Sequence, residues 1–388
     1  MREINLPETE KCCGCGACYS ACPNQAISMI PDEEGFLQPN INKDLCISCG
    51  MCEKICPVLH SGEPREPVAV YAAKAKDDEL RRISSSGGIF SLLARKILDE
   101  GGVVFGAAYE PPTFKVIHKA VFDEKGLDEL RGSKYVQSEI GNTYKEAKQY
   151  LESGRKVLFS GCPCQIAGLK RFLGKDYDNL LLVDVICHGV PSPKVWQIYV
   201  ENVKEKFDGE ILKVYSRREV VWGNYALSFD VARGNGGSQR KYETSPHYFN
   251  GFVMDIFNRK CCNSCSFRAF KSGADVTIGD YWGVVRYHPD IFDVNGVSAI
   301  ILNTERGVNF FSEVTPNLNM VSSKLDSVVA NNKAILGNHK PHPKRFTFFQ
   351  RIEFTEFDVL VSSLSTPPLW YRILRWIKWH TIGKPVTS

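Results

Sequence analysis

Two runs of cysteines near the start of the chain have the spacing of an iron–sulfur protein. Each run reads C-x2-C-x2-C-x3-C and is followed by a proline, Pro23 or Pro57. Bacterial dicluster ferredoxins carry this run, and the fourth cysteine of each run binds the other cluster. We therefore predict two [4Fe–4S] clusters, one on Cys12, Cys15, Cys18 and Cys56 and one on Cys46, Cys49, Cys52 and Cys22.

A structural zinc site is the competing interpretation of these runs. Zinc takes four ligands in a closed tetrahedron, which matches a doubled C-x2-C-x2-C-x3-C-P run poorly. Small residues such as Gly14 and Gly50 allow backbone N–H groups to approach cluster sulfides. Cys13 is an additional cysteine that the pattern does not use, and its simplest interpretation is a bystander thiol.

The remaining cysteines lie in three separate segments and can form a third site. They are Cys162, Cys164, Cys187, Cys261, Cys262 and Cys265. The segment FSGCPCQIAGL is predicted to lie at a strand-to-helix turn, and Cys187 follows an apolar strand. Both positions suit a ligand site, because ligands in α/β sheets bind beyond the carboxyl ends of the strands. A third [4Fe–4S] cluster is one interpretation. A zinc site that includes His188 and a redox pair of Cys162 with Cys164 are the alternatives.

Two polar motifs suit a phosphate-bearing cofactor. Residues 84–88, SSSGG, directly precede a segment of helical apolar spacing, so their hydroxyls and the first helical N–H groups can form an anion cradle. A serine cap with glycines for a turn is the alternative. The second motif, GSKYVQS, offers hydroxyls, the Lys134 ammonium and an aromatic ring, although a surface loop is the commoner explanation of such a segment.

Composition limits the class of protein. The chain has 388 residues, 43% of them hydrophobic and 24% charged, and 15 cysteines. No apolar run approaches the roughly 20 residues of a membrane span, and the start has no apolar signal region. We therefore expect a reducing cytoplasmic compartment, where clustered cysteines hold cofactors more often than disulfides. Residues 1–60 hold four basic and eight acidic residues, which argues against a nucleic-acid partner for this part.

The elements that position these motifs are expected to form an α+β protein. A linker at 61–67 separates a small cluster domain, residues 1–60, from a larger α/β body with a mixed sheet, residues 68–336. PDEEG predicts a hairpin in the small domain. Strands are predicted at 103–109, 115–122, 156–160 and 180–186 and in four later segments; helices are predicted at 88–100, 142–153, 165–173, 193–207 and near 246–259.

The ordered set of motifs resembles the coenzyme F-420 hydrogenase/dehydrogenase beta-subunit family. The set comprises two ferredoxin runs, SSSGG, GSKYVQS, GCPCQIAGL, CHGVPSP, CxxCxF and DVTIGDYWG, over about residues 12–304. The resemblance implies FAD beside a third [4Fe–4S] cluster on Cys164, Cys187, Cys262 and Cys265. It implies flavin contacts at Ser84, Ser85, Ser86, Gly87, Gly88, Ser133, Lys134, Gly161 and Asp280, with Trp282 close by.

The expected function is that of an iron–sulfur flavoprotein oxidoreductase. Electrons from a ferredoxin-type donor would pass through the clusters to FAD and on to an organic acceptor, or in reverse. A flavin suits the end of such a path because a cluster passes one electron whereas most organic reductions need two. The alternative is an electron-transfer subunit that feeds a partner enzyme. Lys134, His188 and Asp280 are the titratable candidates for a proton donor.

The last segment, residues 337–388, departs from the family pattern. It carries eight basic and three acidic residues, and WYRILRWIKWH at 370–380 places apolar and basic residues on opposite helical faces. Such a helix can lie on an anionic membrane surface, which adds peripheral membrane contact to the cytoplasmic expectation. A helix docked on the body is the alternative.

Overall fold

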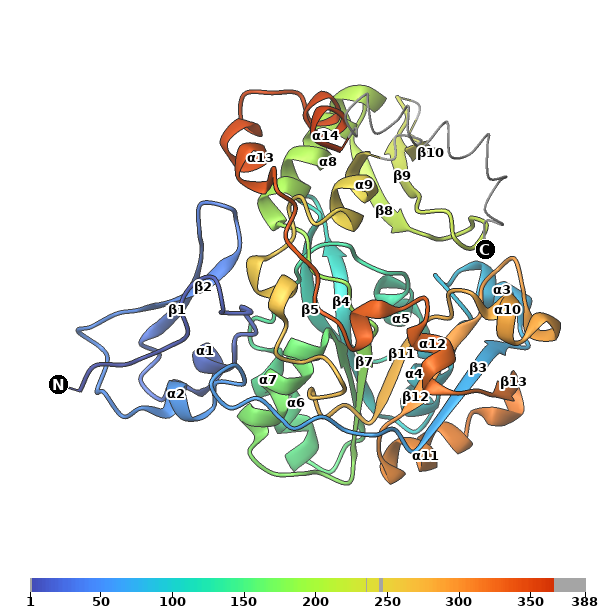
Figure 1. Cartoon of the computed structure of the whole chain (residues 1–388), viewed down its shortest axis with the longest axis horizontal. Helices are drawn as coiled ribbons and strands as arrows, with labels where there is room; N and C mark the ends of the chain where they lie inside the picture. Colours follow the sequence, from blue (N-terminus) through green and yellow to red (C-terminus); the bar gives the residue numbers. More distant parts are fainter. Residues whose placement is uncertain (1, 235, 244–246, 366–388) are drawn as a thin grey trace, which may run out of the picture.

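A small N-terminal domain, here called the head, packs against one side of a larger body (Figure 1). The computed structural model describes residues 2–234, 236–243 and 247–365. In the head, residues 2–60, β1 (Ile27–Pro31) and β2 (Leu37–Ile41) form the predicted antiparallel hairpin. The short helices α1 (Ala17–Ala21) and α2 (Met51–Lys54) begin after Gly16 and Gly50, which both have a φ of 73°. A side chain would strain that left-handed backbone.

The body is built on one eight-stranded mixed sheet with the order β13-β3-β12-β11-β7-β6-β4-β5. Its central strands are parallel neighbours: β4 (Val103–Glu110), β6 (Val157–Gly161), β7 (Leu180–Val185) and β11 (Val276–Asp280). The other members pair antiparallel: β3 (Ala69–Ala75), β5 (Lys115–Val121), β12 (Ser298–Leu302) and β13 (Leu318–Ser322).

Helices cover both faces of the sheet, which is why its central strands are nearly continuous apolar runs. Val104, Leu158 and Leu181 pack on one face with α4 (Ile89–Asp99), α5 (Glu124–Leu130) and α11 (Glu305–Ser312). Phe105, Phe159 and Leu182 pack on the other face with α6 (Thr143–Glu152) and α7 (Pro163–Leu173). The head shares this second core through Cys13, Cys15 and Ala17.

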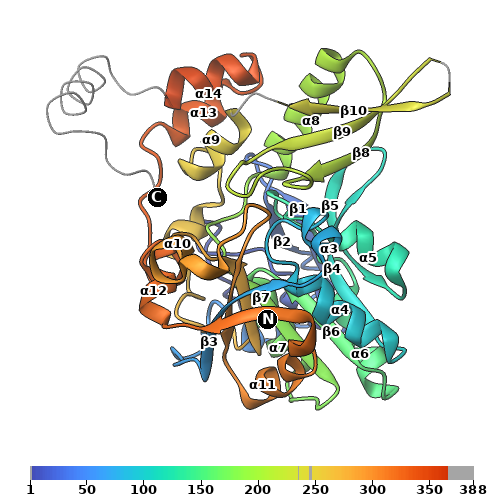
Figure 2. The same cartoon turned by 90° about the vertical axis from the view of Figure 1, so that its right-hand side faces the viewer.

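A second layer lies above the main sheet in both views (Figure 2). It consists of the antiparallel strands β8 (Ile211–Ser216), β9 (Leu227–Ala232) and β10 (Ser238–Glu243). Around them lie α8 (Pro193–Phe207), α9 (His247–Val253), α13 (Arg345–Arg351) and α14 (Phe357–Ser365). Trp196, Phe229, Phe257 and Phe357 belong to the common core of this layer.

The α+β class and the mixed sheet are confirmed, with differences at particular elements. The helix expected near 246–259 ends at Val253, because the chain then turns through Asp255, whose φ is 57°. The strands β3, β10 and β13 were not expected from the sequence. The strand β10 reads SQRKYE, and only one of its residues is buried. Its sequence therefore lacks the apolar–polar alternation from which a strand is predicted.

Short elements complete the described chain: α3 (Asp78–Arg82), η1 (Lys260–Ser264), α10 (Val284–Tyr287), η2 (Pro289–Ile291), η3 (Thr315–Asn317), α12 (Leu325–Val329) and η4 (Lys333–Ile335). Residues 61–67 form no helix or strand, and the Arg65 N–H donates to the Ala269 carbonyl at 3.1 Å. Within the described ranges no helix is both long and apolar enough to cross a membrane. The helix expected at 370–380 lies outside the described residues.

Candidate functional site: a series of cysteine cages beside a large cavity

The eight cysteines of the two runs in the head surround two small cavities, and the additional Cys13 lies in the wall of one of them. One is lined by Cys12, Cys15, Cys18 and Cys56, and the other by Cys22, Cys46, Cys49 and Cys52. Each cavity therefore takes three cysteines from one run and the fourth from the other run, which is the grouping that a dicluster ferredoxin requires. We call the first cavity proximal, because it faces the body, and the second distal.

The two cavities differ in their exposure to solvent. Cys15 and Cys56, of the proximal cavity, are buried, whereas Cys49 of the distal cavity is exposed. Burial raises the pKa of Cys18 to about 12, so this thiol is protonated at neutral pH when it holds no metal. Cluster binding must therefore displace protons from these side chains.

A third cysteine-lined cavity, of about 340 Å³, lies in the body and is here called the body cage. Its wall contains all four cysteines that the family resemblance implies as ligands: Cys164, Cys187, Cys262 and Cys265. Cys164 is in the first turn of α7, Cys187 follows β7, and the other two belong to or directly follow η1. The adjacent parallel strands β6 and β7 bring the first two segments together at their carboxyl ends.

The structure separates Cys162 from Cys164. Cys162 is the N-cap of α7 and lines the neighbouring larger cavity, whereas Cys164 lines the body cage. Their side chains have different nearest sulfurs, since Cys162 neighbours Cys187 and Cys164 neighbours Cys13. This arrangement does not favour a redox pair of Cys162 and Cys164. Cys13 and Cys261 also line the body cage, so the wall does not choose between Cys261 and Cys262.

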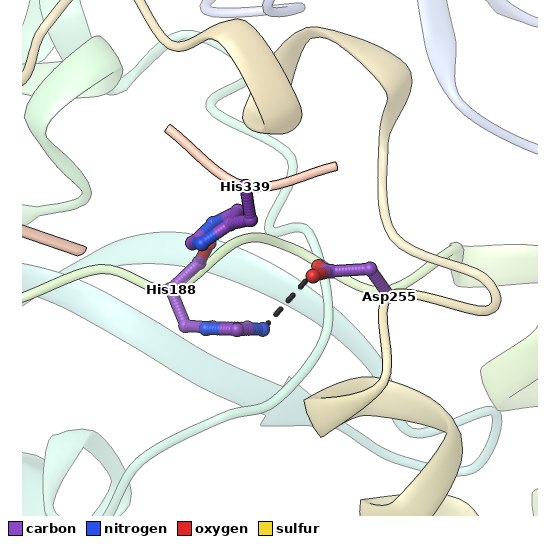
Figure 3. A group of neighbouring side chains, drawn as sticks. All are labelled: His188, Asp255 and His339. Carbon is purple, nitrogen blue, oxygen red and sulfur yellow. Dashed lines mark hydrogen bonds and ion pairs between the residues drawn. The ribbon is translucent and has the colours of Figure 1, made fainter. Parts of the chain in front are cut away.

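His188, the candidate zinc ligand, lines the body cage, but its Nε2 faces a carboxylate. Its Nε2 lies 3.3 Å from Asp255 Oδ1, and one ligand atom from each of His188, Asp255 and His339 lies within 4.8 Å of the others (Figure 3). The His339 Nε2 is 2.8 Å from both the His188 carbonyl oxygen and an Arg268 guanidinium nitrogen. Because the Arg268 cation would repel a metal ion, the group fits a hydrogen-bond network better than a metal site.

A large cavity of about 730 Å³ lies beside the body cage, within the range of cofactor pockets. Its wall includes eight of the nine predicted flavin contacts: Ser84, Ser85, Ser86, Gly88, Ser133, Lys134, Gly161 and Asp280. Gly87 is the exception and is a correction to the prediction. Its N–H donates to Ser298 Oγ at 3.0 Å, and a Cβ at this position would lie 2.5 Å from the Ala73 carbonyl oxygen. Gly87 thus allows close packing of the backbone on β3.

One end of the large cavity is suited to an anion. The helix α4 begins there without a side-chain cap, and Ile89, Phe90 and Ser91 of its first turn line the wall. The Ser133 N–H donates to Ser85 Oγ at 2.9 Å, which ties the two polar motifs together.

Lys134 supplies a cation to this end of the large cavity. Its ammonium donates to the carbonyls of Glu129 and Arg131 at 2.9 and 2.8 Å. An ammonium has three donors, so one is left for a ligand. Burial lowers the Lys134 pKa to about 7.

The wall of the large cavity also carries Arg217, which no sequence motif had indicated, together with several aromatic rings. Arg217, directly after β8, donates to Asp280 at 2.6 Å and to the Tyr135 hydroxyl at 3.0 Å. Its guanidinium lies 5.1 Å from the Tyr225 ring centre and 5.6 Å from that of Trp282. Trp222 donates to the other Asp280 oxygen at 2.7 Å, so both carboxylate oxygens have partners and Asp280 braces the wall.

Shared wall residues connect these cavities in a series. Cys13 and Val58 line both the proximal cavity of the head and the body cage. Residues 185–190, which include Cys187 and His188, line both the body cage and the large cavity. The order along the molecule is therefore distal cavity, proximal cavity, body cage and large cavity. Neighbouring one-electron carriers in this order would lead to one cofactor pocket.

Comparisons with known proteins define the class of this chain. Residues 11–59 match the family model of the 4Fe-4S dicluster domain. Residues 70–144 and 154–327 match the models for the N-terminal and C-terminal parts of the coenzyme F420 hydrogenase/dehydrogenase beta subunit. The chain belongs to this family of oxidoreductase components and carries an iron–sulfur dicluster domain at its N-terminal end.

Known relatives match most of this chain at low identity. It is 21% identical over 359 residues to one subunit of the F(420)H(2) dehydrogenase of Methanosarcina mazei, covering 86% of this chain and 91% of the relative. It is 24% identical over 311 residues to the coenzyme F420-dependent sulfite reductase of Methanocaldococcus jannaschii. That match covers 76% of this chain but only 44% of the reductase, so this chain spans less than half of the reductase's length.

A solved structure from an F420-reducing [NiFe] hydrogenase complex of Methanosarcina barkeri is also similar. The TM-score is 0.45 with 17% identity, covering 74% of this chain and 92% of the chain compared.

Proposed function

We propose that this protein is an iron–sulfur flavoprotein oxidoreductase that exchanges electrons between a ferredoxin-type partner and an organic substrate. The observation that carries this proposal is the series of three cysteine cages that leads, through the walls containing Cys13 and Cys187, to the large cavity. The proposed cluster ligands are the eight head cysteines that line the distal and proximal cavities together with Cys164, Cys187, Cys262 and Cys265.

The distal cavity is the proposed entry point for electrons. Cys49 is exposed, and Ile47 and Leu45 beside it are 61% and 49% exposed, so a protein partner can approach this cluster closely. The proximal cavity lies against the body, where Cys15 is buried in the core that the head shares with α6 and α7. Direction is not specified by this arrangement, because the same path serves oxidation and reduction.

The residues of the large cavity fit a phosphate-bearing ring cofactor, and we propose FAD. When bound, a flavin exchanges single electrons with a cluster and a hydride with an organic molecule. The first turn of α4 and the Lys134 ammonium would bind the diphosphate, because both are donors with positive potential. Trp282 and Tyr225 offer aromatic faces to a ring, and the packed wall around Arg217 would exclude water.

The proposed organic substrate is a deazaflavin. The family name and the names of both relatives contain coenzyme F420. A deazaflavin could instead be the resident ring of the large cavity, since it carries the same kinds of groups. The second candidate function is an electron-transfer subunit without its own substrate, which is favoured by the relative named as a dehydrogenase subunit.

Cofactor stoichiometry tests the proposal. The chain is purified without oxygen, iron and acid-labile sulfide are measured, and any released chromophore is identified by mass. About twelve irons and one FAD per chain are expected from three four-iron clusters and a flavin. About eight irons without a chromophore would contradict both the body cluster and the flavoenzyme. A released deazaflavin in place of FAD would correct the cofactor alone.

Turnover separates the two candidate functions. The purified chain is mixed with reduced ferredoxin and oxidised coenzyme F420, and the absorbance of the deazaflavin is followed. Reduction by the chain alone supports the enzyme. Electron uptake by the clusters without reduction of the deazaflavin would support the subunit that feeds a partner.

A further inference from the structure

A buried arginine joins the head to the body between two cysteine cages. Arg259 is 2% exposed and directly precedes η1. Its three nitrogens donate to the carbonyl of Cys12 at 2.8 Å, to the carbonyl of Leu37 at 3.0 Å and to Gln137 Oε1 at 2.8 Å. Two of these acceptors belong to the head, whereas Gln137 belongs to the body. The guanidinium also lies 5.3 Å from the Phe36 ring centre.

Arg259 has no carboxylate partner among the residues that the structure describes, since its side chain donates to uncharged oxygens. Burying a cation without an anion is unfavourable, because the cation loses its hydration and gains no opposite charge. The anionic groups available nearby are sulfurs. Arg259 lines the body cage together with Cys13, Cys261 and Cys262. Cys12, whose carbonyl accepts a hydrogen bond from Arg259, lines the proximal cavity. Clusters bound in the two cages would supply the missing negative charge.

The loop that carries Cys12 and Cys13 is fitted closely to this arginine. Gln137 donates from Nε2 to the Cys13 carbonyl at 3.1 Å, so the arginine and the glutamine together fix two successive carbonyls of the head. Gly14 has a φ of 65°, and a Cβ there would lie 2.6 Å from an Arg259 nitrogen. The Cys13 side chain neighbours Cys15 in the wall of the proximal cavity and Cys164 in the wall of the body cage. The proximal cavity and the body cage therefore approach each other at this loop.

We propose that Arg259 is a positioning residue of the junction between the two clusters: it fixes the Cys12–Cys13 loop on the body and raises the reduction potentials of the clusters on both sides. This inference rests on the proposed function, because it requires clusters in both cages. Reduction adds one electron, and hence one negative charge, to a cluster. A buried cation nearby stabilises that charge, and the low dielectric around Arg259 screens it little. Only an electron moves between the clusters, and no bond is made or broken.

The test compares the reduction potentials of Arg259→Met, Arg259→Lys and the unchanged protein, measured by EPR-monitored redox titration of the full, anaerobically purified chain. Arg259→Met removes the charge and is expected to shift at least one flanking cluster to a more negative potential. We expect at least a tenfold change in the one-electron equilibrium constant, or about 59 mV. Arg259→Lys keeps the charge, so its reduction potentials are expected to lie close to those of the unchanged protein. If the methionine variant loses iron, Arg259→Gln replaces it, since its amide can still donate to the Cys12 carbonyl.

A second buried arginine between head and body provides the matched control. Arg345 is 6% exposed, donates to the Asn258 carbonyl next to Arg259, and forms an ion pair with Glu34 of the head hairpin. The double variant Glu34→Gln with Arg345→Met loosens the same interface but removes a cation that already has its anion. It is expected to leave the potentials of the flanking clusters near those of the unchanged protein.

The outcomes distinguish this inference from the proposed function. Fewer than about twelve irons in the unchanged protein contradict the proposed body cluster itself. If the iron content is complete and Arg259→Met has the same cluster reduction potentials as the unchanged protein, the proposed role of the Arg259 charge is overturned. An equal shift in the Glu34→Gln/Arg345→Met control, or in Arg259→Lys, overturns it as well, because the cause would then be loosened packing.

Discussion

The Cys13 and Cys164 side chains are neighbours in the wall of the body cage, although one belongs to the head and the other to the first turn of α7. Both side chains line the body cage, and Cys13 also lines the proximal cavity of the head. Cys13 is therefore a wall residue that the two cavities share. The proposed path for electrons between head and body rests on this shared wall rather than on the linker between the two parts.

Cys164 and Cys162 are expected to differ as ligands of the body cage. Replacing Cys164 with Ala should remove about four irons per chain, because a cluster rarely survives the loss of a thiolate. Replacing Cys162 with Ala should leave the iron content unchanged, since this side chain lines the large cavity and caps α7. Iron and sulfide analysis with EPR of the reduced proteins measures both. Equal iron loss in the two variants would show that the body cage has been assigned incorrectly.

Gly168 is not a ligand, but its lack of a side chain is expected to keep the ligand Cys15 in position at the proximal cavity. It lies in α7, where a Cβ would approach the Cys15 sulfur at 3.1 Å and the Tyr144 hydroxyl at 2.8 Å. Alanine favours a helix by about 1 kcal/mol over glycine, so any damage from Gly168→Ala must be steric. We expect altered EPR signals from the proximal cluster, and faster loss of iron in air.

Gly234→Ala is the control for this substitution, because a Cβ at that position meets no atom within 4 Å. Unchanged EPR signals and iron retention in Gly168→Ala would mean that Cys15 can shift without consequence for the cluster.

Lys134 is expected to link cofactor binding to pH. Burial lowers its pKa to about 7 in the free cavity, so it is largely neutral at pH 8. A diphosphate favours the charged form and should raise the pKa, so binding at pH 8 should take up a proton, and affinity should fall as pH rises from 6 to 9. Titration calorimetry in buffers of different ionisation enthalpy measures the uptake.

Lys134→Met should abolish this proton uptake and lower the affinity for FAD about tenfold, the equivalent of about 1.4 kcal/mol. Lys119→Met provides the comparison, because Lys119 is a partly exposed lysine paired with Glu129 outside the large cavity. Proton uptake that persists in Lys134→Met would assign the effect to another group.

Arg217 is expected to be a stabilising part of the wall of the large cavity. Its side chain is 4% exposed and that of its partner Asp280 is 10% exposed. Arg217→Met leaves the buried carboxylate with Trp222 as its remaining donor, and breaking such a pair costs about 3–5 kcal/mol. Denaturant unfolding of the cofactor-free chain measures the loss. Arg217→Met with Asp280→Leu should recover part of it; no recovery would assign the loss to the rings of Tyr225 and Trp282.

Local patterns predicted much of the fold and the groups of site residues. The four central strands and the helices α4, α6 and α7 beside them are continuous apolar or amphipathic runs, so periodicity alone was enough to find them, whereas the shorter helices α5 and α11 were missed. The helix α4 and the SSSGG motif before it were also predicted. The strands β3, β10 and β13 were missed because strand pairing, not alternation, decides their state. Arg217 and Arg259 were missed because neither belongs to a recognisable motif.

By itself the sequence determined the two head cages, because a short cysteine run must wrap within a few residues of chain whatever the body does. It also determined the segments that contain the body cage and the anion cradle. Only the tertiary structure decided that Cys162 and Cys164 line different cavities, and that Cys13 and Arg259 lie between two cages. Such contacts join residues far apart in the chain, so they depend on how β6, β7, α7 and the head pack together, and no local spacing encodes that packing.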